Sequence, residues 1–159
     1  MKNKSFKNIL FCTDLSETSN SAFEFALSMA GRDQGRLNIL YVIPDNPNKG
    51  MSEGYLSNPR IKQFKENFKN GVDRKFSELY VEKIEDAVEF KTVTKSGTPH
   101  EEIMLYAEEE NSDIIVMGTN CRRGVAKLLS GSVSEKVARG SKRPVMLIHS
   151  EKTGNFITA

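Results

Sequence analysis

The chain contains no tryptophan, two cysteines, two histidines and five prolines in 159 residues. Cys12 and Cys121 lie far apart in the sequence, so they form neither a disulfide framework nor a metal knuckle, and both suit a reducing compartment. Only His100 and His149 could join them as ligands, and neither is at ligand spacing. These scarcities exclude a disulfide-stapled domain and a zinc site.

The sequence also lacks a long apolar run and an excess of one charge. No stretch approaches the roughly 20 residues that span a bilayer, and the basic N-terminus runs into too few apolar residues for a secretory signal. Lysines and arginines number 23 against 21 acidic residues, a net charge of +2, and the two signs are interspersed. We therefore expect a cytoplasmic protein, with neither a membrane nor a nucleic acid as partner.

Length and composition are typical of one globular domain. Hydrophobic residues make up 38% of the chain and charged residues 28%. Periodic apolar patterning extends to residue 149, whereas residues 150–159 show none. We therefore predict a single domain over residues 1–149, followed by a C-terminal tail.

Five short apolar runs alternate with four segments of helical period, which predicts an α/β fold. The runs from Ile114 and from Val145 are apolar on both faces, as in parallel strands covered by helices, whereas the third run alternates like an edge strand. The predicted strands are Asn8–Cys12, Leu37–Val42, Ala87–Val93, Asp113–Met117 and Val145–His149.

Apolar spacing and capping residues predict the helices. The first runs from Glu17 to about Arg32 and should bury Ala22, Phe25, Ala26 and Met29. The second, between Asn58 and Val81, has one apolar stripe, made of Ile61, Phe64, Phe68, Val72, Phe76 and Leu79. The third should start at Pro99 with Thr98 as its cap and end near Glu110, and the fourth should follow a capping box at Ser132 and end at Gly140.

This order of elements predicts a five-stranded, doubly wound parallel sheet with four helices, a Rossmann-like architecture. With strand order 3-2-1-4-5, the first and fourth strands lie side by side where the winding reverses. Ligands of such sheets bind beyond the carboxyl ends of those strands. The topology therefore directs attention to the loops that begin at Thr13 and at Gly118.

The loop after the fourth strand has features that suit an anion. Gly118 and Gly131 let backbone approach a ligand closely, and Ser132 opens a helix whose free N–H groups attract phosphate. A purely structural interpretation, in which the glycines turn the chain and Ser132 only begins a helix, stays open. Arg122 and Arg123 could neutralise phosphate or be surface residues, and Lys127 suits the surface.

The stretch 118–137 resembles the signature loop of the universal stress protein family, in which Gly, two residues, Gly and nine residues precede Gly and Ser or Thr. Further matches cover nearly the whole chain, from Ile9–Ser16 and Leu40–Pro44 through Gly97–Pro99 to Ser112–Gly118 and Arg143–Val145. This resemblance implies the family's fold, a homodimer and, in one branch, binding of ATP or a related adenine nucleotide. The apolar edge at Val145–His149 would suit pairing with a second copy.

By position, the resemblance implies which residues bind the nucleotide. Adenine would lie near Thr13 and the main chain of Val42, and Asp14 by the ribose or a phosphate-bound Mg²⁺. Alternatively, Asp14 is a turn or capping residue before the first helix. Met117 would be a further residue of the nucleotide site. The phosphates would lie against Gly118, the loop after it with Asn120 and Cys121, and then Gly131, Ser132 and the N–H of Val133.

One position departs from the signature. Cys121 replaces the second glycine and follows Asn120 where histidine is common, so triphosphate binding could weaken, AMP or ADP could be favoured, or the site could stay vacant. A redox pair of Cys121 with Cys12 is conceivable, although Cys12 suits a small core residue better. The sequence shows no nucleophile–base constellation, so we expect no enzyme, with slow hydrolysis of bound ATP as the one activity left open. Two functions stay open. The protein is either a stress-response regulator that binds an adenine nucleotide, or a stress-response dimer that binds none and acts through protein–protein interaction.

Overall fold

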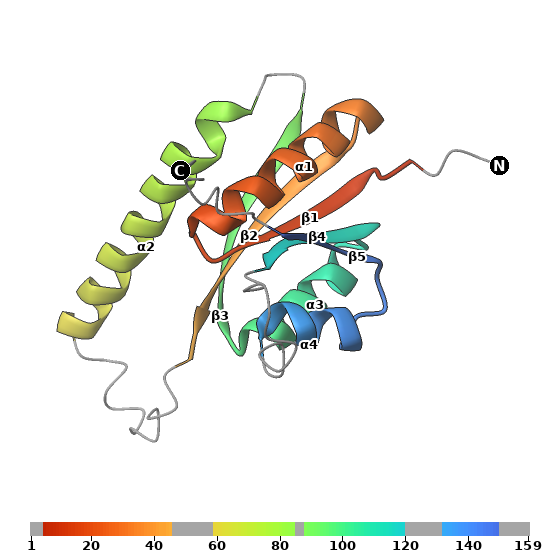
Figure 1. Ribbon diagram of the computed structural model, residues 1–159. Helices are drawn as coiled ribbons and strands as arrows, with labels where there is room; N and C mark the ends of the chain where they lie inside the picture. Colours follow the sequence, from red (N-terminus) through yellow and green to blue (C-terminus); the bar gives the residue numbers. More distant parts are fainter. Residues whose placement is uncertain (1–4, 46–58, 85–87, 120–131, 150–159) are drawn as a thin grey trace, which may run out of the picture.

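One parallel sheet of five strands, in the order β3-β2-β1-β4-β5, forms the centre of the computed structural model (Figure 1). The structure describes residues 5–45, 59–84, 88–119 and 132–149. The predicted fold class and strand order are confirmed, with β3 at one edge and β5 at the other. The strands are β1 (Asn8–Thr13), β2 (Arg36–Pro44), β3 (Glu89–Gly97), β4 (Ile114–Thr119) and β5 (Val145–His149).

In the described residues, four α-helices and a short 3-10 helix connect the strands. They are α1 (Glu17–Asp33), α2 (Pro59–Leu79), the 3-10 helix η2 (Val81–Lys83), α3 (Pro99–Glu109) and α4 (Val133–Gly140). The sequence did not predict η2. No described helix is long and apolar enough to cross a membrane.

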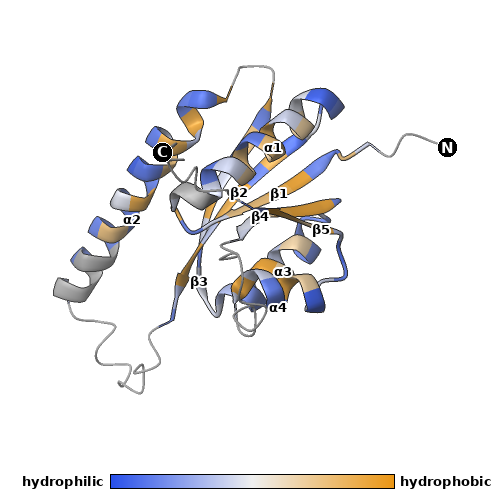
Figure 2. Ribbon diagram, viewed as in Figure 1, coloured by the Kyte–Doolittle hydropathy of each residue, from blue (hydrophilic) through white to orange (hydrophobic). Residues whose placement is uncertain are grey.

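The sheet has an apolar core on each face, because alternate residues of its central strands point in opposite directions. On one face, Ile9 and Phe11 of β1 pack with residues of α1 and α2. On the other, Leu10 and Cys12 pack with residues of α3 and α4. Figure 2 shows the central strands coloured as hydrophobic between the helices, which accords with burial on both sides.

Three predicted strand features need correction. β2 extends to Pro44, and β3 ends at Gly97 rather than Val93, because the two strands pair in register through Pro44 and Gly97. Pairing with a neighbour therefore lengthens strands beyond their apolar runs. β5 is not covered on both faces, since Leu147 keeps 40% of its surface exposed at the edge of the sheet.

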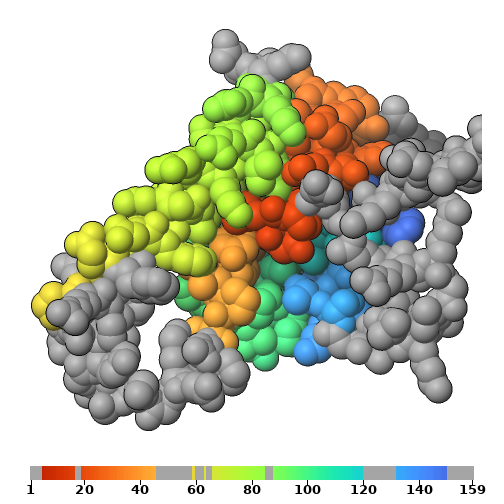
Figure 3. All heavy atoms as spheres, turned by 60° about the vertical axis from the view of Figure 1, so that its left-hand side comes forward, coloured from red at the N-terminus to blue at the C-terminus, as the bar shows by residue number. Residues whose placement is uncertain are grey.

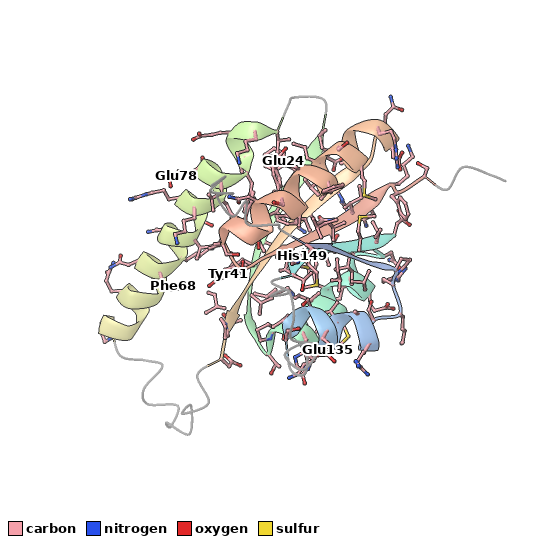
Figure 4. The ribbon with its side chains drawn as sticks, in the orientation of Figure 1. Glu24, Tyr41, Phe68, Glu78, Glu135 and His149 are labelled. Atoms are coloured by element: carbon pink, nitrogen blue, oxygen red, sulfur yellow. The ribbon has the colours of Figure 1, made fainter. Side chains whose placement is uncertain are left out.

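Two predicted core residues on the helices are also wrong. Phe25 is 53% exposed, and the buried aromatic residue of α1 is Phe23. The core face of α1 is centred between Ala22 and Phe23, so Phe25 lies roughly 100° of helical rotation away from it. On α2, Val72 and Phe76 are buried as predicted, whereas Phe68 is exposed nearer the helix start (Figure 4). The side chains of Ile61 and Phe64 lie outside the described part.

The two predicted helix caps have different outcomes. Ser132 caps α4 as expected, since its Oγ accepts a hydrogen bond from the N–H of Glu135 at 3.2 Å. Thr98 precedes α3 but makes no side-chain cap. Its backbone carbonyl instead accepts hydrogen bonds from the N–H groups of Glu101 and Glu102. Because Pro99 has no backbone N–H, one fewer donor at the start of α3 needs an acceptor, and a side-chain cap is less necessary.

Candidate functional site

A cavity of about 390 Å³ opens at the carboxyl ends of β1, β2 and β4, beside the first turns of α3 and α4. Its volume falls within the range typical of small-molecule sites. Figure 3 shows the end of β1 and β2 adjoining α3 and α4 on one face of the molecule. The cavity therefore lies where the strand order reverses, the position at which doubly wound sheets bind ligands.

The residues that line the cavity form an apolar group and a polar group. One group is apolar and comprises Cys12, Leu40, Val42, Pro44, Pro99, Ile103 and Met117. The other is polar or presents backbone, and comprises Thr13, Asp14, Ser16, Ser19, Tyr41, Gly118, Thr119, Ser132, Val133 and Ser134. Among these described residues, Asp14 is the only one that carries a full charge at neutral pH. Such a surface suits a ligand with a flat apolar part and a hydroxylated part.

The structure brings seven predicted site residues to this one cavity, namely Thr13, Asp14, Val42, Met117, Gly118, Ser132 and Val133. Asn120, Cys121 and Gly131 lie outside the described residues, as do Arg122, Arg123 and Lys127. The sequence did not assign ten further lining residues to the site, namely Cys12, Ser16, Ser19, Leu40, Tyr41, Thr119, Ser134, Pro44, Pro99 and Ile103. For Pro99 and Ile103, the sequence signal was the Gly97–Thr98–Pro99 turn, which follows a strand that ends at the same edge of the sheet.

The turn after β3 places α3 beside the cavity. Gly97 has φ of +154°, and a Cβ there would meet Glu102 Cγ at 2.8 Å. Its carbonyl accepts a hydrogen bond from the N–H of Asp45 at 3.1 Å, which joins the ends of β2 and β3. Only glycine satisfies both the backbone conformation and the close packing. This position therefore holds Pro99 and Ile103 at the apolar side of the cavity.

Asp14 has the turn role that the sequence left open. Its Oδ1 accepts hydrogen bonds from the N–H of Ser16 at 3.0 Å, from the Ser16 hydroxyl and from Ser19 Oγ at 2.6 Å. Its Oδ2 accepts no hydrogen bond in the described part of the chain, and the residue lines the cavity. The turn therefore orients the carboxylate without using its second oxygen, so a structural role does not displace a ligand-binding role.

The environment of Asp14 keeps its carboxylate ionised. Partial burial favours the neutral form, but hydrogen bonds from Ser16 and Ser19 outweigh it and hold the pKa of Asp14 below its ordinary value. An ionised carboxylate accepts hydrogen bonds from hydroxyls and can bind a metal ion. Of the described residues, no three His, Cys, Asp or Glu side chains cluster as a metal site of their own.

The start of α4 supplies hydrogen-bond donors. The first N–H groups of a helix have no acceptor within it and, with the helix dipole, attract anions. At α4 these groups belong to Val133 and Ser134, which line the cavity. The Ser132 hydroxyl is occupied by the cap to Glu135. The polar side of the cavity therefore presents backbone donors and one carboxylate.

Cys12 is a core residue, as the sequence favoured. It is 4% exposed, and burial raises the pKa of its thiol far above the ordinary value, which suppresses the reactive thiolate at neutral pH. Its suggested redox partner, Cys121, lies outside the described residues. Cys12 thus contributes apolar surface to the wall of the cavity.

The fold and the cavity together define a doubly wound α/β protein with a ligand site at the point where the strand order reverses. The model of the universal stress protein family matches residues 5–149. The chain belongs to that family.

Comparison with individual proteins agrees with this assignment. Universal stress protein MJ0577 from Methanocaldococcus jannaschii is 29% identical over 153 residues, which covers 90% of this chain and 94% of that protein. Its solved structure has a TM-score of 0.71 with 30% identity, over 94% of this chain and 100% of the other.

Two more distant solved structures share the fold. One is a universal stress protein in complex with cAMP, with a TM-score of 0.60 and 22% identity over 92% of this chain and 98% of that chain. The other, from Archaeoglobus fulgidus, is in complex with dAMP, with a TM-score of 0.59 and 18% identity over 91% and 99%.

Proposed function

We propose that this universal stress protein binds an adenine nucleotide in the cavity at the ends of β1, β2 and β4, and that occupancy regulates a stress response. The observation that supports this most is the meeting of seven predicted nucleotide-contacting residues around one cavity of about 390 Å³. Distant relatives of the same fold bind cAMP and dAMP, which share the adenine base.

The chemistry of the lining suggests how a nucleotide would lie. Adenine suits the apolar side, where the backbone at Val42 could pair with the base edge while Ile103 and Met117 pack on its faces. The ribose hydroxyls suit the free Oδ2 of Asp14, which is also the one described carboxylate there that could bind a phosphate-bound Mg²⁺. The phosphates suit the N–H groups at the start of α4 and the backbone of Gly118.

The proposal describes a binding protein rather than an enzyme. Described residues of the cavity offer a hydrogen-bonded carboxylate and a protonated buried thiol, but no base positioned beside a hydroxyl nucleophile. Binding alone can regulate, because a ligand that prefers one conformation shifts the population toward it. The expected cytoplasmic location stays a prediction.

A second function is favoured by one feature of the sequence. Cys121 stands where the family signature has glycine, and a side chain there could obstruct the phosphates. In that case the protein would act as a homodimer through its surface, without a nucleotide. The exposed Leu147 on edge strand β5 would suit the dimer in either case.

Isothermal titration of the purified protein with ATP, ADP, AMP and cAMP, with and without Mg²⁺, distinguishes the two functions. We expect one nucleotide per chain with at least one of these ligands. Heat with none of them would reject the nucleotide proposal for the natural sequence. In that event, restored binding in Cys121→Gly would identify the cysteine as the cause, and continued absence of binding would favour a protein–protein role.

A further inference from the structure

The loop between β1 and α1 is hydrogen-bonded to Tyr80, a residue that does not line the cavity. Tyr80 follows the end of α2 and is fully buried, with its hydroxyl 2.6 Å from Thr13 Oγ1. No described residue of α2 or η2 lines the cavity. Among described residues, this is the only hydrogen bond between the 59–84 segment and the loop at Thr13–Ser16.

The position of the Tyr80 hydroxyl is determined by packing. Its ring meets Phe11 edge to face at a centroid distance of 5.3 Å and Phe23 at 4.8 Å, and Phe76 lies beyond at 6.5 Å. Aromatic rings enclosed in this way leave the phenol little freedom. Burial raises the pKa of Tyr80, so the hydroxyl keeps its proton at neutral pH and can donate it.

Thr13 connects the Tyr80 hydroxyl to the backbone of the loop, because its Oγ1 contacts both. The N–H of Leu15 donates to Thr13 Oγ1 at 2.8 Å. Leu15 has φ of +63°, a left-handed conformation that is unfavourable for a non-glycine residue and needs support from its surroundings. Since Thr13 Oγ1 lies between Tyr80 and Leu15, the phenol supports the conformation that places Asp14 at the cavity.

We propose that Tyr80 is a positioning residue of the nucleotide site: it holds Thr13, and through Thr13 the Asp14–Leu15 turn, in the geometry that binds ligand. The inference rests on the proposed nucleotide binding. It also couples the site to the end of α2. A ligand that needs the turn in this geometry stabilises the packed position of Tyr80, and that position favours ligand binding by the same free energy.

The test compares AMP and ATP affinities of the wild type, Tyr80→Phe, Thr13→Val and the double variant by isothermal titration. Tyr80→Phe keeps the ring and should weaken binding about 3- to 10-fold, the effect of one lost neutral hydrogen bond. In the Thr13→Val background the same change should have no further effect. An equal loss in both backgrounds would contradict an action through Thr13.

A matched control separates positioning from the general loss of a buried phenol. Tyr106 is 3% exposed, and its hydroxyl makes no hydrogen bond with any described residue, so Tyr106→Phe should leave affinity unchanged. Amide hydrogen exchange gives a readout without ligand, and exchange at Leu15 should accelerate in Tyr80→Phe but not in Tyr106→Phe.

The outcomes also separate this inference from the proposed function. No binding by the wild type would reject both. Wild-type binding with unchanged affinity in Tyr80→Phe would overturn only the positioning role.

Discussion

At the scale of single residues, the site depends on short polar side chains that hold one another in place. Ser19 is 4% exposed and lies below the turn, where its Oγ donates to Asp14 Oδ1 at 2.6 Å and accepts from the Asp14 N–H at 3.3 Å. The sequence predicted Asp14 from a family resemblance but gave no sign of Ser19, because one serine in a helix has no distinctive pattern. A residue outside the family signature therefore orients the carboxylate of Asp14.

Ser19→Ala should raise the pKa of Asp14 toward or above the ordinary value of 3.8, because it removes a hydrogen bond to the charged form and leaves the burial. The depressed pKa of the folded state contributes stability above pH 3.8, and that stability is lost as pH falls through the folded value. The variant should therefore be less stable than the wild type above pH 3.8, and this difference should shrink as the pH falls below that value. A carboxyl ¹³C titration by NMR measures the pKa directly.

Ser112→Ala is the matched control, since Ser112 is also buried and its Oγ makes no hydrogen bond within the described part of the chain. It should leave the Asp14 titration unchanged. A pKa in Ser19→Ala that equals or falls below the wild-type value would contradict the assigned cause.

At the scale of elements, the two edge strands differ in how they face solvent. β3 bears Lys91 and Lys95 along its length, and charged side chains discourage pairing between edges. β5 has only five residues, exposes Leu147 and pairs with β4 alone in the described part of the chain. This asymmetry supports β5, rather than β3, as the strand at which a second copy would bind.

Leu147→Glu should convert a dimer to a monomer, because it places a charge on the apolar edge of β5. Leu105→Glu, on α3, is the control, since Leu105 is a leucine of similar exposure, 51% against 40%. Sedimentation velocity at several concentrations measures the state of assembly. A dimer in Leu147→Glu, or a monomer in the wild type, would contradict pairing through this edge.

At the scale of the whole molecule, the sequence predicted most of the architecture, because parallel strands buried on both faces have continuous apolar runs. The alternation of strands and helices predicted the doubly wound topology, and the strand order 3-2-1-4-5 places the cavity at the ends of β1 and β4. Phe25 failed as a core residue because the apolar spacing of α1 did not show that Phe23, rather than Phe25, faces the core. Phe68 failed because the apolar stripe of α2 does not show which of its residues the core covers. The Tyr80–Thr13 contact was not predictable, since it joins residues 67 positions apart.

We expect the cavity at the ends of β1, β2 and β4 to bind an adenine nucleotide. Backbone amide chemical-shift mapping during titration with ATP and AMP tests it most directly. We expect saturable chemical-shift changes concentrated at Asp14, Val42, Gly118 and Val133, with little change along the β3 residues Glu89–Lys91. Shifts confined to other surfaces, or no shifts at all with either nucleotide, would contradict it.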